Sequence, residues 1–437
     1  MMMDTGLGRF FSFPGSLTMK KVCSLFLLLV LATTASFAQQ PEKDDGRFFF
    51  FKDGDTIVIM GDSITEQHLY SNYLEMWSTS RFPKRKFTFR NVGISGDRST
   101  GGNKRFQRDV LPYKPTVLTV DFGMNDANGP YQDFLKGLQG IADQAKAAKV
   151  RVAWITPQPI EKREEGPAYK GYNETLEKFS QGIEQIAAKN QGMFVDQFHP
   201  YLAILARARA TDPKNINVTG GDAVHPGPPG QVVMAAAILK RLDFQRLVSR
   251  VVIDGSKVET ENCQVTIGSP QSPGAVTFRR LDFALPFFPA DAKSILKWSP
   301  ILDDMNRYLL QIKSLKAGKY AVELDGKKIA EYTDKELAKG VNLAGPALAA
   351  GPIANQVNKI WTAVKDKNRY FHDQVFRGVV LAGPKSPIFK DVDPKAIEAK
   401  RKELFEERMK KMPELDATVR KALELKAHTV HVVPLVK

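Results

Sequence analysis

The sequence predicts an α/β fold: a parallel β-sheet covered by helices on both faces, then a β-rich segment, then a helical C-terminal region. Three observations support this. Apolar, strand-like runs alternate with helix-compatible segments between residues 50 and 250. Short alternating runs with turn signals follow, and a stretch rich in both acidic and basic residues precedes the C-terminus. Strands that alternate with helices are typical of βαβ units and therefore of a parallel sheet.

Apolar runs that end at turn-forming residues are predicted to form the parallel sheet. The predicted strands are residues 55–60, 87–94, 116–123, 150–157 and 192–198. Helix-compatible segments lie between them, including QDFLKGLQGIADQAKAAK and NETLEKFSQGIEQIAAKN. Asn173 opens the second segment, and we expect it to be the N-cap of that helix because asparagine accepts hydrogen bonds from the first helical amides.

The sequence pattern changes after residue 250, where alternating, strand-like runs replace the alternation of strands and helices. The runs KVETENCQVTIG, GAVTFRRLDFAL, RYLLQIKSL and KYAVELDGKKIAEYT are predicted strands, and Asp325-Gly326 is predicted to be a hairpin turn. From about Asp334 the pattern becomes helical, with opposite charges at i, i+4 spacing. We therefore predict a catalytic domain over residues 44–250, a β-rich segment over 251–333 and a helical region over 334–437 that packs on the first domain.

The N-terminus has the pattern of a secretory signal peptide over residues 1–38. Two lysines after Met19 precede an apolar core and then Ser36-Phe37-Ala38. Met1 and Met19 are alternative start residues. No later apolar run reaches the length of about 18 residues that a membrane span requires. The sequence thus predicts an exported protein, periplasmic or secreted, without a stable membrane span.

Composition excludes several classes of protein. The hydrophobic fraction of 43% and the charged fraction of 25% are those of a globular protein rather than a disordered one. The formal charge of +15 is spread along the chain, and no nucleic-acid-binding motif accompanies it, so no nucleic-acid partner is predicted. Cys263 is the one cysteine beyond the signal-like segment, which excludes an internal disulfide in the mature chain; we expect it to be a small residue in a strand.

Four short stretches together supply the groups for ester cleavage by a serine. Ser63 follows the first predicted strand, Gly96 the second and Asn125 the third, while Asp222 and His225 precede a helix. A serine hydroxyl needs a base, which His225 supplies, and the base needs an acid such as Asp222 to fix its tautomer. The Ser63 and Gly96 amides and the Asn125 side chain are candidate donors to the oxyanion.

These stretches resemble the GDSL, or SGNH, hydrolase family over about residues 50–245. The four residues that name the family correspond to Ser63, Gly96, Asn125 and His225, and its acid to Asp222. The resemblance implies a three-layer, flavodoxin-like sheet and hydrolysis of esters without a metal or cofactor. Consistently, the sequence has no His-Glu-x-x-His motif and no paired Cys/His spacing, so we predict no metal site.

One competing base is present. Asp196 to Pro200 repeats the Asp-x-x-His-Pro pattern of Asp222 to Pro226, so His199 is an alternative by spacing. We prefer His225 because a glycine-rich loop and a new helix follow it at once.

Further candidates for substrate binding lie near the motifs. Asp97, Arg98 and Asn103 follow Gly96 and are candidates to line the substrate groove, although Arg98 could equally pair with an acid. His68 is also a candidate, with a position on a helix surface as the preferred interpretation.

The function predicted from these features is an exported serine esterase. It hydrolyses acyl esters, with short chains such as acetyl preferred, on a small molecule or a polysaccharide. Two alternatives stay open: a lipase, lysophospholipase or thioesterase, and a glycan-binding or scaffold protein with incidental hydrolysis. The sequence decides neither the oligomeric state nor the role of residues 251–437.

Overall fold

The computed structural model describes residues 49–161, 170–214, 217–222 and 224–435. The predicted signal peptide, residues 1–38, lies outside these ranges. The described residues belong to a single compact unit, Asp44–Lys437.

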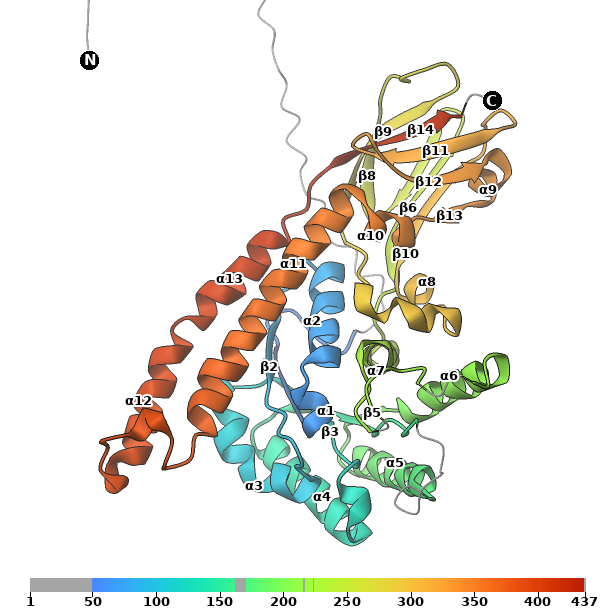
Figure 1. The fold of residues 1–437 in the computed structure, drawn as a ribbon. Coiled ribbons are helices and arrows are strands. Elements are labelled where there is room, and N and C mark those ends of the chain that lie inside the picture. Colours follow the sequence, from blue (N-terminus) through green and yellow to red (C-terminus); the bar gives the residue numbers. More distant parts are fainter. Residues whose placement is uncertain (1–48, 162–169, 215–216, 223, 436–437) are drawn as a thin grey trace, which may run out of the picture. The chain divides into compact units, whose positions relative to one another are not determined.

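The first sheet confirms the five predicted parallel strands (Figure 1). Its strands are β1 (Thr56–Gly61), β2 (Thr88–Asn91), β3 (Val117–Asp121), β4 (Arg151–Ile155) and β5 (Met193–Val195). They pair in the order β2-β1-β3-β4-β5, and every pairing is parallel. This is the flavodoxin-like order, in which ligands bind beyond the carboxyl ends of the strands.

Helices cover both faces of this sheet, because alternate side chains of each strand point to opposite sides. In β1, Ile57 and Ile59 join one core cluster while Val58 and Met60 join the other. The first cluster is shared with α2 (Leu69–Arg81), α6 (Phe198–Thr211) and α7 (Pro228–Arg241). The second is shared with α3 (Ser99–Asp109), α4 (Tyr131–Ala147) and α5 (Tyr172–Lys189). The result is the predicted three-layer α/β fold.

The start of α5 differs from the prediction. The helix begins at Tyr172, and its N-cap is Gly171 with φ of 70°, so the expectation that Asn173 caps the helix is wrong. The Asn173 side chain instead accepts a hydrogen bond from the Ile160 amide at 2.9 Å and donates one to the Ile160 carbonyl at 3.1 Å. The asparagine therefore forms hydrogen bonds with the backbone of the loop after β4 rather than with the first amides of its own helix.

Two further sheets follow in the chain. Their strands are β6 (Leu247–Asp254), β7 (Lys257–Glu261), β8 (Cys263–Ile267), β9 (Val276–Asp282), β10 (Arg307–Ile312), β11 (Lys319–Leu324), β12 (Lys327–Thr333), β13 (Val341–Asn342) and β14 (His428–Pro434). The orders are β13-β10-β6-β7 and β12-β11-β14-β9-β8. The predicted hairpin is confirmed: Asp325 and Gly326 both have positive φ, 47° and 77°, as a type I′ turn requires.

The C-terminal region is mostly helical, as predicted. Its helices are α9 (Asp334–Lys339), α10 (Ala344–Ala349), α11 (Gly351–Tyr370), the π-helix η4 (Phe371–Val380), α12 (Ile397–Met409) and α13 (Met412–Ala422). The short helix α8 (Ile301–Met305) lies earlier, within the β-rich segment. It is not wholly helical, because β14 returns to pair with both β11 and β9. The last strand therefore completes a sheet whose other members come from the β-rich segment.

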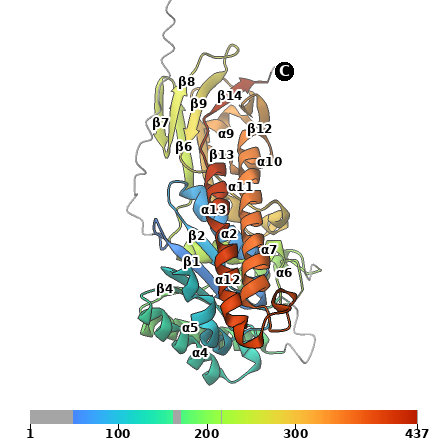
Figure 2. The ribbon, with the colours of Figure 1, turned by 90° about the vertical axis from the view of Figure 1, so that its left-hand side faces the viewer.

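The helical tail packs on the first domain. Helix α11 lies beside α2 and α13 in both ribbon views (Figures 1 and 2). The buried Lys367 ammonium lies 2.9 Å from a carboxylate oxygen of Glu75 on α2, and Asn368 donates to Asn72 at 2.7 Å. Because a charge is buried only when it is paired, these contacts fix where α11 sits on α2.

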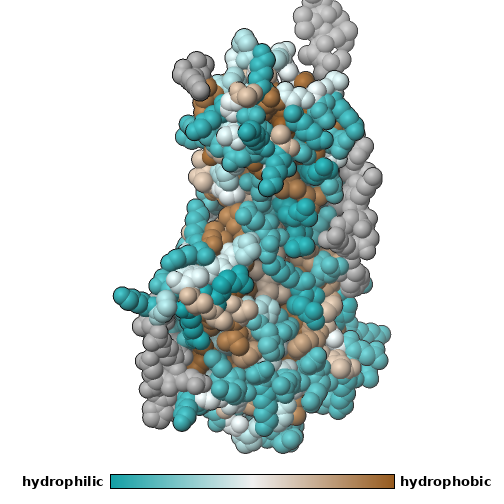
Figure 3. All heavy atoms as spheres, turned by 90° about the vertical axis from the view of Figure 1, so that its right-hand side faces the viewer, coloured by the Kyte–Doolittle hydropathy of each residue, from teal (hydrophilic) through white to brown (hydrophobic). Residues whose placement is uncertain are grey.

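The surface is polar over much of the molecule. Figure 3 shows a face that is largely hydrophilic, with separate hydrophobic areas. Among the described helices, none is both long enough and apolar enough to cross a membrane.

Candidate active site

Ser63 lies where the first strand meets a short helix. Strand β1 ends at Gly61 and α1 (Ser63–Glu66) follows at once. Residue 61 has to be glycine, because a Cβ there would lie 2.1 Å from the Thr65 hydroxyl oxygen. Asp62 is the N-cap, and its side chain accepts a hydrogen bond from the Ile64 amide at 2.9 Å. The strand–turn–helix geometry thus places the Ser63 hydroxyl at the carboxyl edge of the sheet.

The structure brings His225 to Ser63 across 162 residues of sequence. The Ser63 Oγ lies 2.8 Å from His225 Nε2. On the other side of the ring, Nδ1 lies 3.0 Å from a carboxylate oxygen of Asp222. The second Asp222 oxygen accepts hydrogen bonds from the Val224 and His225 amides at 2.8 and 2.7 Å, so the acid also shapes the loop that carries the imidazole.

Asp222 holds its charge, and its position beside the base favours that charge. Burial acts to raise its pKa, but hydrogen bonds from the His225 and Val224 amides and from the His225 ring outweigh it and lower the pKa. The side chain is 66% exposed, against 37% for His225. The dyad is therefore open to solvent, and water screens its attraction more than in a buried pair.

A buried glutamine ties the base loop to the nucleophile segment. Gln231 on α7 donates to the Pro226 carbonyl at 3.3 Å and to the Gln67 side chain at 2.6 Å. Its side-chain oxygen accepts from the Tyr70 amide at 3.0 Å. Sequence reasoning missed Gln231, since a glutamine in an apolar helix gives no signal of its partners.

The loop after β2 carries Gly96 beside the nucleophile. The Ile94 amide donates to the Gly61 carbonyl at 3.1 Å, which joins this loop to the turn before Ser63. Gly96 is exposed and has φ of +75°, a region that favours glycine. Among the described residues its amide has no hydrogen-bond partner, so this donor is available to a substrate.

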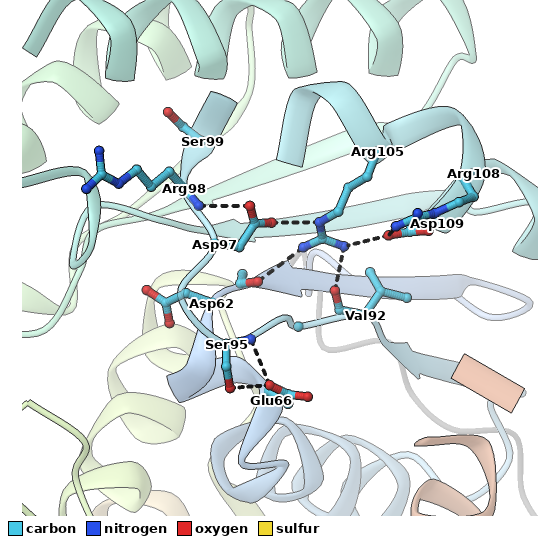
Figure 4. A network of polar contacts seen from close by, with 12 residues as sticks. Asp62, Glu66, Val92, Ser95, Asp97, Arg98, Ser99, Arg105, Arg108 and Asp109 are labelled. Atoms are coloured by element: carbon cyan, nitrogen blue, oxygen red, sulfur yellow. Dashed lines mark hydrogen bonds and ion pairs between the residues drawn. The ribbon is translucent and has the colours of Figure 1, made fainter. Parts of the chain in front are cut away.

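One arginine holds the loop from the side of α3 (Figure 4). Arg105 pairs with the Asp97 carboxylate at 2.7 Å and donates to the carbonyls of Val92 and Gly61 at 2.7 and 3.2 Å. The Asp97 carboxylate thus fixes the backbone around Gly96, which leaves it poorly placed to bind substrate. Its carbonyl also accepts from the Asn125 side chain at 3.0 Å.

Asn125, which follows the end of β3, is the last of the predicted catalytic residues. Its amide nitrogen donates to the Asp97 carbonyl and makes a longer, 3.4 Å contact with Asp62. The N–H group in this longer contact is the one that can donate a hydrogen bond to an oxyanion. Burial is the main cause that raises the pKa of Asp62 to about 7, with further increases from Asp126 and Asp97.

Comparisons with known proteins identify the family. Residues 59–233, which contain all five candidate residues, match the model of the GDSL-like Lipase/Acylhydrolase family. Residues 59–233 are thus a domain of that family. The protein is therefore an ester-bond hydrolase.

Two relatives show how far the similarity extends. An acetylxylan esterase from Geobacillus stearothermophilus is 24% identical over 224 residues, which are 45% of this chain and 98% of that protein. A solved structure described as BT4096, a gut microbial diltiazem-metabolizing enzyme, is 24% identical, with a TM-score of 0.74 over 88% of this chain and 98% of that chain. The second likeness shows the fold of this GDSL-like hydrolase, including its C-terminal regions.

The other predicted residues of the hydrolase lie in different settings. His199 repeats the dyad geometry, with Nδ1 2.9 Å from Asp196, but its Nε2 faces Glu177 at 3.5 Å rather than Ser63. The structure therefore places His225, and not His199, at the serine. Arg98 is exposed, and its guanidinium lies beside Gly129.

Two substrate-binding candidates face other parts of the protein. Asn103 faces α4, where its side-chain oxygen accepts from Gln144 at 2.7 Å, so its side chain packs between two helices. His68 is not on a helix surface. Its ring nitrogens are buried without partners among the described residues, and its ring lies edge-on to His372 at 4.8 Å. Burial lowers the pKa of His68 to about 3, so the ring is neutral at ordinary pH.

Proposed function

We propose that this hydrolase is an exported serine esterase that removes short acyl groups, such as acetyl, from carbohydrate. The observation that carries the proposal is the 2.8 Å contact between Ser63 Oγ and His225 Nε2, with Asp222 on the opposite ring nitrogen. These are the distances at which a serine can transfer its proton to a base.

The reaction follows from these contacts. Asp222 accepts a hydrogen bond from Nδ1 and so keeps the unprotonated nitrogen toward Ser63. As Oγ bonds to the ester carbon, its proton passes to Nε2, and the carbonyl oxygen gains negative charge. The amides of Gly96 and Ser63 and the side chain of Asn125 donate to that oxygen. The Nε2 proton then goes to the departing alcohol, and an acyl-enzyme remains.

Water completes the cycle through the same groups. His225 takes a proton from a water molecule, the oxygen attacks the acyl carbon, and Ser63 leaves with the proton from Nε2. The products are the carboxylic acid and the free enzyme. Each oxyanion donor typically supplies a factor of about 10² to 10³ in rate.

The carbohydrate part rests on the openness of the site and on a relative. His225 and Asp222 are 37% and 66% exposed, and Gly96 is exposed, which suits a polar chain that lies across the surface. The acetylxylan esterase from Geobacillus stearothermophilus has a name that refers to such a substrate. Export rests on the signal-like residues 19–38 and is tested by whether the mature protein isolated from cells starts near Gln39.

A substrate panel tests the proposal. Acetate release from acetylated xylan is measured beside turnover of aryl acetate and of a long-chain aryl ester, for the parent and for Ser63→Ala. We expect release from the glycan and from aryl acetate, lost in the variant. Turnover of aryl acetate without any glycan deacetylation would remove the carbohydrate claim, and preference for the long chain would favour a lipase.

A further inference from the structure

The carboxylate of Glu66 connects the C-terminal tail to the loop that carries Ser95 and Gly96. Glu66 is the last residue of the helix that begins at Ser63, and its side chain is only 9% exposed. One of its oxygens accepts from the Ser95 amide at 2.7 Å and from the Ser95 hydroxyl, immediately before Gly96 (Figure 4). The other accepts from Arg377 Nε at 2.6 Å and lies 3.4 Å from His372 Nε2.

The two tail residues come from an unusual segment. Both lie on the π-helix η4, which continues directly from α11. π-Helical turns are rare in proteins, and those that occur are frequently found at functional sites. The segment is anchored at its start by the buried contacts of Lys367 and Asn368 with α2, so its position relative to α1 is fixed.

The electrostatics favour a charged Glu66 in this bridge. Burial acts to raise its pKa, but the Ser95 hydroxyl, Arg377 and the Ser95 amide outweigh burial and lower it. A carboxylate bonded to a guanidinium and to a backbone amide makes charge-assisted hydrogen bonds, which are stronger than neutral ones. The tail thus holds Glu66 rigid, and Glu66 holds the Ser95 backbone.

We propose that Arg377 and His372 are positioning residues of the esterase. Their contacts hold the Glu66 carboxylate in place, and Glu66 in turn holds the Ser95 backbone by a hydrogen bond. The neighbouring Gly96 amide is thereby oriented toward the oxyanion. The loop is then held from two sides, by Arg105 through Asp97 and by the tail through Glu66. The inference rests on the proposed function, because the Gly96 amide matters only if an oxyanion forms near Ser63. It gives the C-terminal region a role in catalysis.

The expected defect lies in kcat rather than in binding. Loss of an oxyanion donor costs about 10² to 10³ in rate. A loop that loses the support of Glu66 keeps the Gly96 donor but no longer holds it in one position, so we expect roughly a 10-fold to 100-fold fall in kcat. KM should change less than about threefold, since neither tail residue touches the proposed substrate position.

Arg377→Gln tests the proposal with a matched control from α11, the helix that continues into η4. Arg369→Gln removes an arginine whose one ion pair within the described part of the chain is with exposed Asp366, and it should leave kcat unchanged. Arg377→Lys keeps the charge and should restore part of the lost rate. Glu66→Gln should reproduce the defect, and the double variant with Arg377→Gln should be little worse than either alone.

The outcomes are distinguishable. A kcat within twofold of the parent in both Arg377→Gln and Glu66→Gln, whatever the melting temperature, would overturn the positioning role while leaving the esterase proposal intact. If Ser63→Ala retains full activity, the esterase mechanism itself fails. A fall in kcat of Arg377→Gln with unchanged KM and partial rescue by lysine is the result that supports the inference.

Discussion

Asp222→Asn separates the two tasks of the acid beside His225. One Asp222 oxygen accepts from the Val224 and His225 amides, and the other accepts from Nδ1. An asparagine that keeps its oxygen on the two amides turns its NH₂ group toward Nδ1. The imidazole then has to place its proton on Nε2, where it can no longer accept the proton of Ser63.

The magnitude follows from the cost of the opposite orientation. Flipping the asparagine gives Nδ1 an acceptor again but loses two backbone hydrogen bonds, at about 0.5–1.5 kcal/mol each. The correct tautomer is therefore disfavoured by about 1–3 kcal/mol, a factor of about 5 to 150. The lost charge adds less than about 1 kcal/mol, because Asp222 is 66% exposed and solvent screens it. We expect kcat/KM to fall roughly 10-fold to 1,000-fold.

The assay is aryl-ester hydrolysis with thermal unfolding measured in parallel. The matched control is Asp196→Asn, which makes the same change in the dyad of His199, where Asp196 also accepts from the backbone amide and from Nδ1. The control should keep full activity, and both variants should melt close to the parent. An Asp222→Asn enzyme within threefold of the parent would refute the tautomer argument.

Three other predictions follow from the contacts. Lys367→Met leaves Glu75 buried without its cation and should lower the free energy of unfolding by about 3–5 kcal/mol in urea titrations. Lys400→Met, at a partly exposed ion pair, should not. The pKa of His68 is about 3 in the folded chain and about 6.5 in the unfolded chain, so stability is lost as pH falls from 6.5 toward 3. His68→Asn should flatten the dependence of the free energy of unfolding on pH in this range. An unchanged pH dependence would contradict the prediction. Asn125→Ala should lower kcat by about 10² to 10³ with little change in KM, and a purely KM effect would exclude an oxyanion role.

The sequence predicts the sheet and the catalytic constellation for physical reasons that are local. Short apolar runs bounded by turn residues, such as residues 55–60, are typical of buried strands, and each motif residue follows a strand end or precedes a helix. The fold order then brings Ser63 and His225 together without further information. These parts of the prediction depend on short windows of sequence.

The remainder depends on contacts between distant segments, which short windows do not contain. Glu66 meets Arg377 across 311 residues, and nothing around either residue names the other. The local sequence suggests a helix cap for Asn173 and a substrate contact for Asn103. In the structure their side chains bond to residues of other elements, Ile160 and Gln144. Strand β14 gains its conformation by pairing between β11 and β9, which its own seven residues cannot indicate.

Covalent capture of the nucleophile tests the central claim most directly. The parent is incubated with a fluorophosphonate, digested, and the labelled peptide is identified by mass spectrometry, beside the His225→Ala variant. We predict a stoichiometric adduct on Ser63 that forms at least about 100-fold more slowly without the imidazole. Stoichiometric labelling of another serine, or labelling of Ser63 at an equal rate in His225→Ala, would contradict the account.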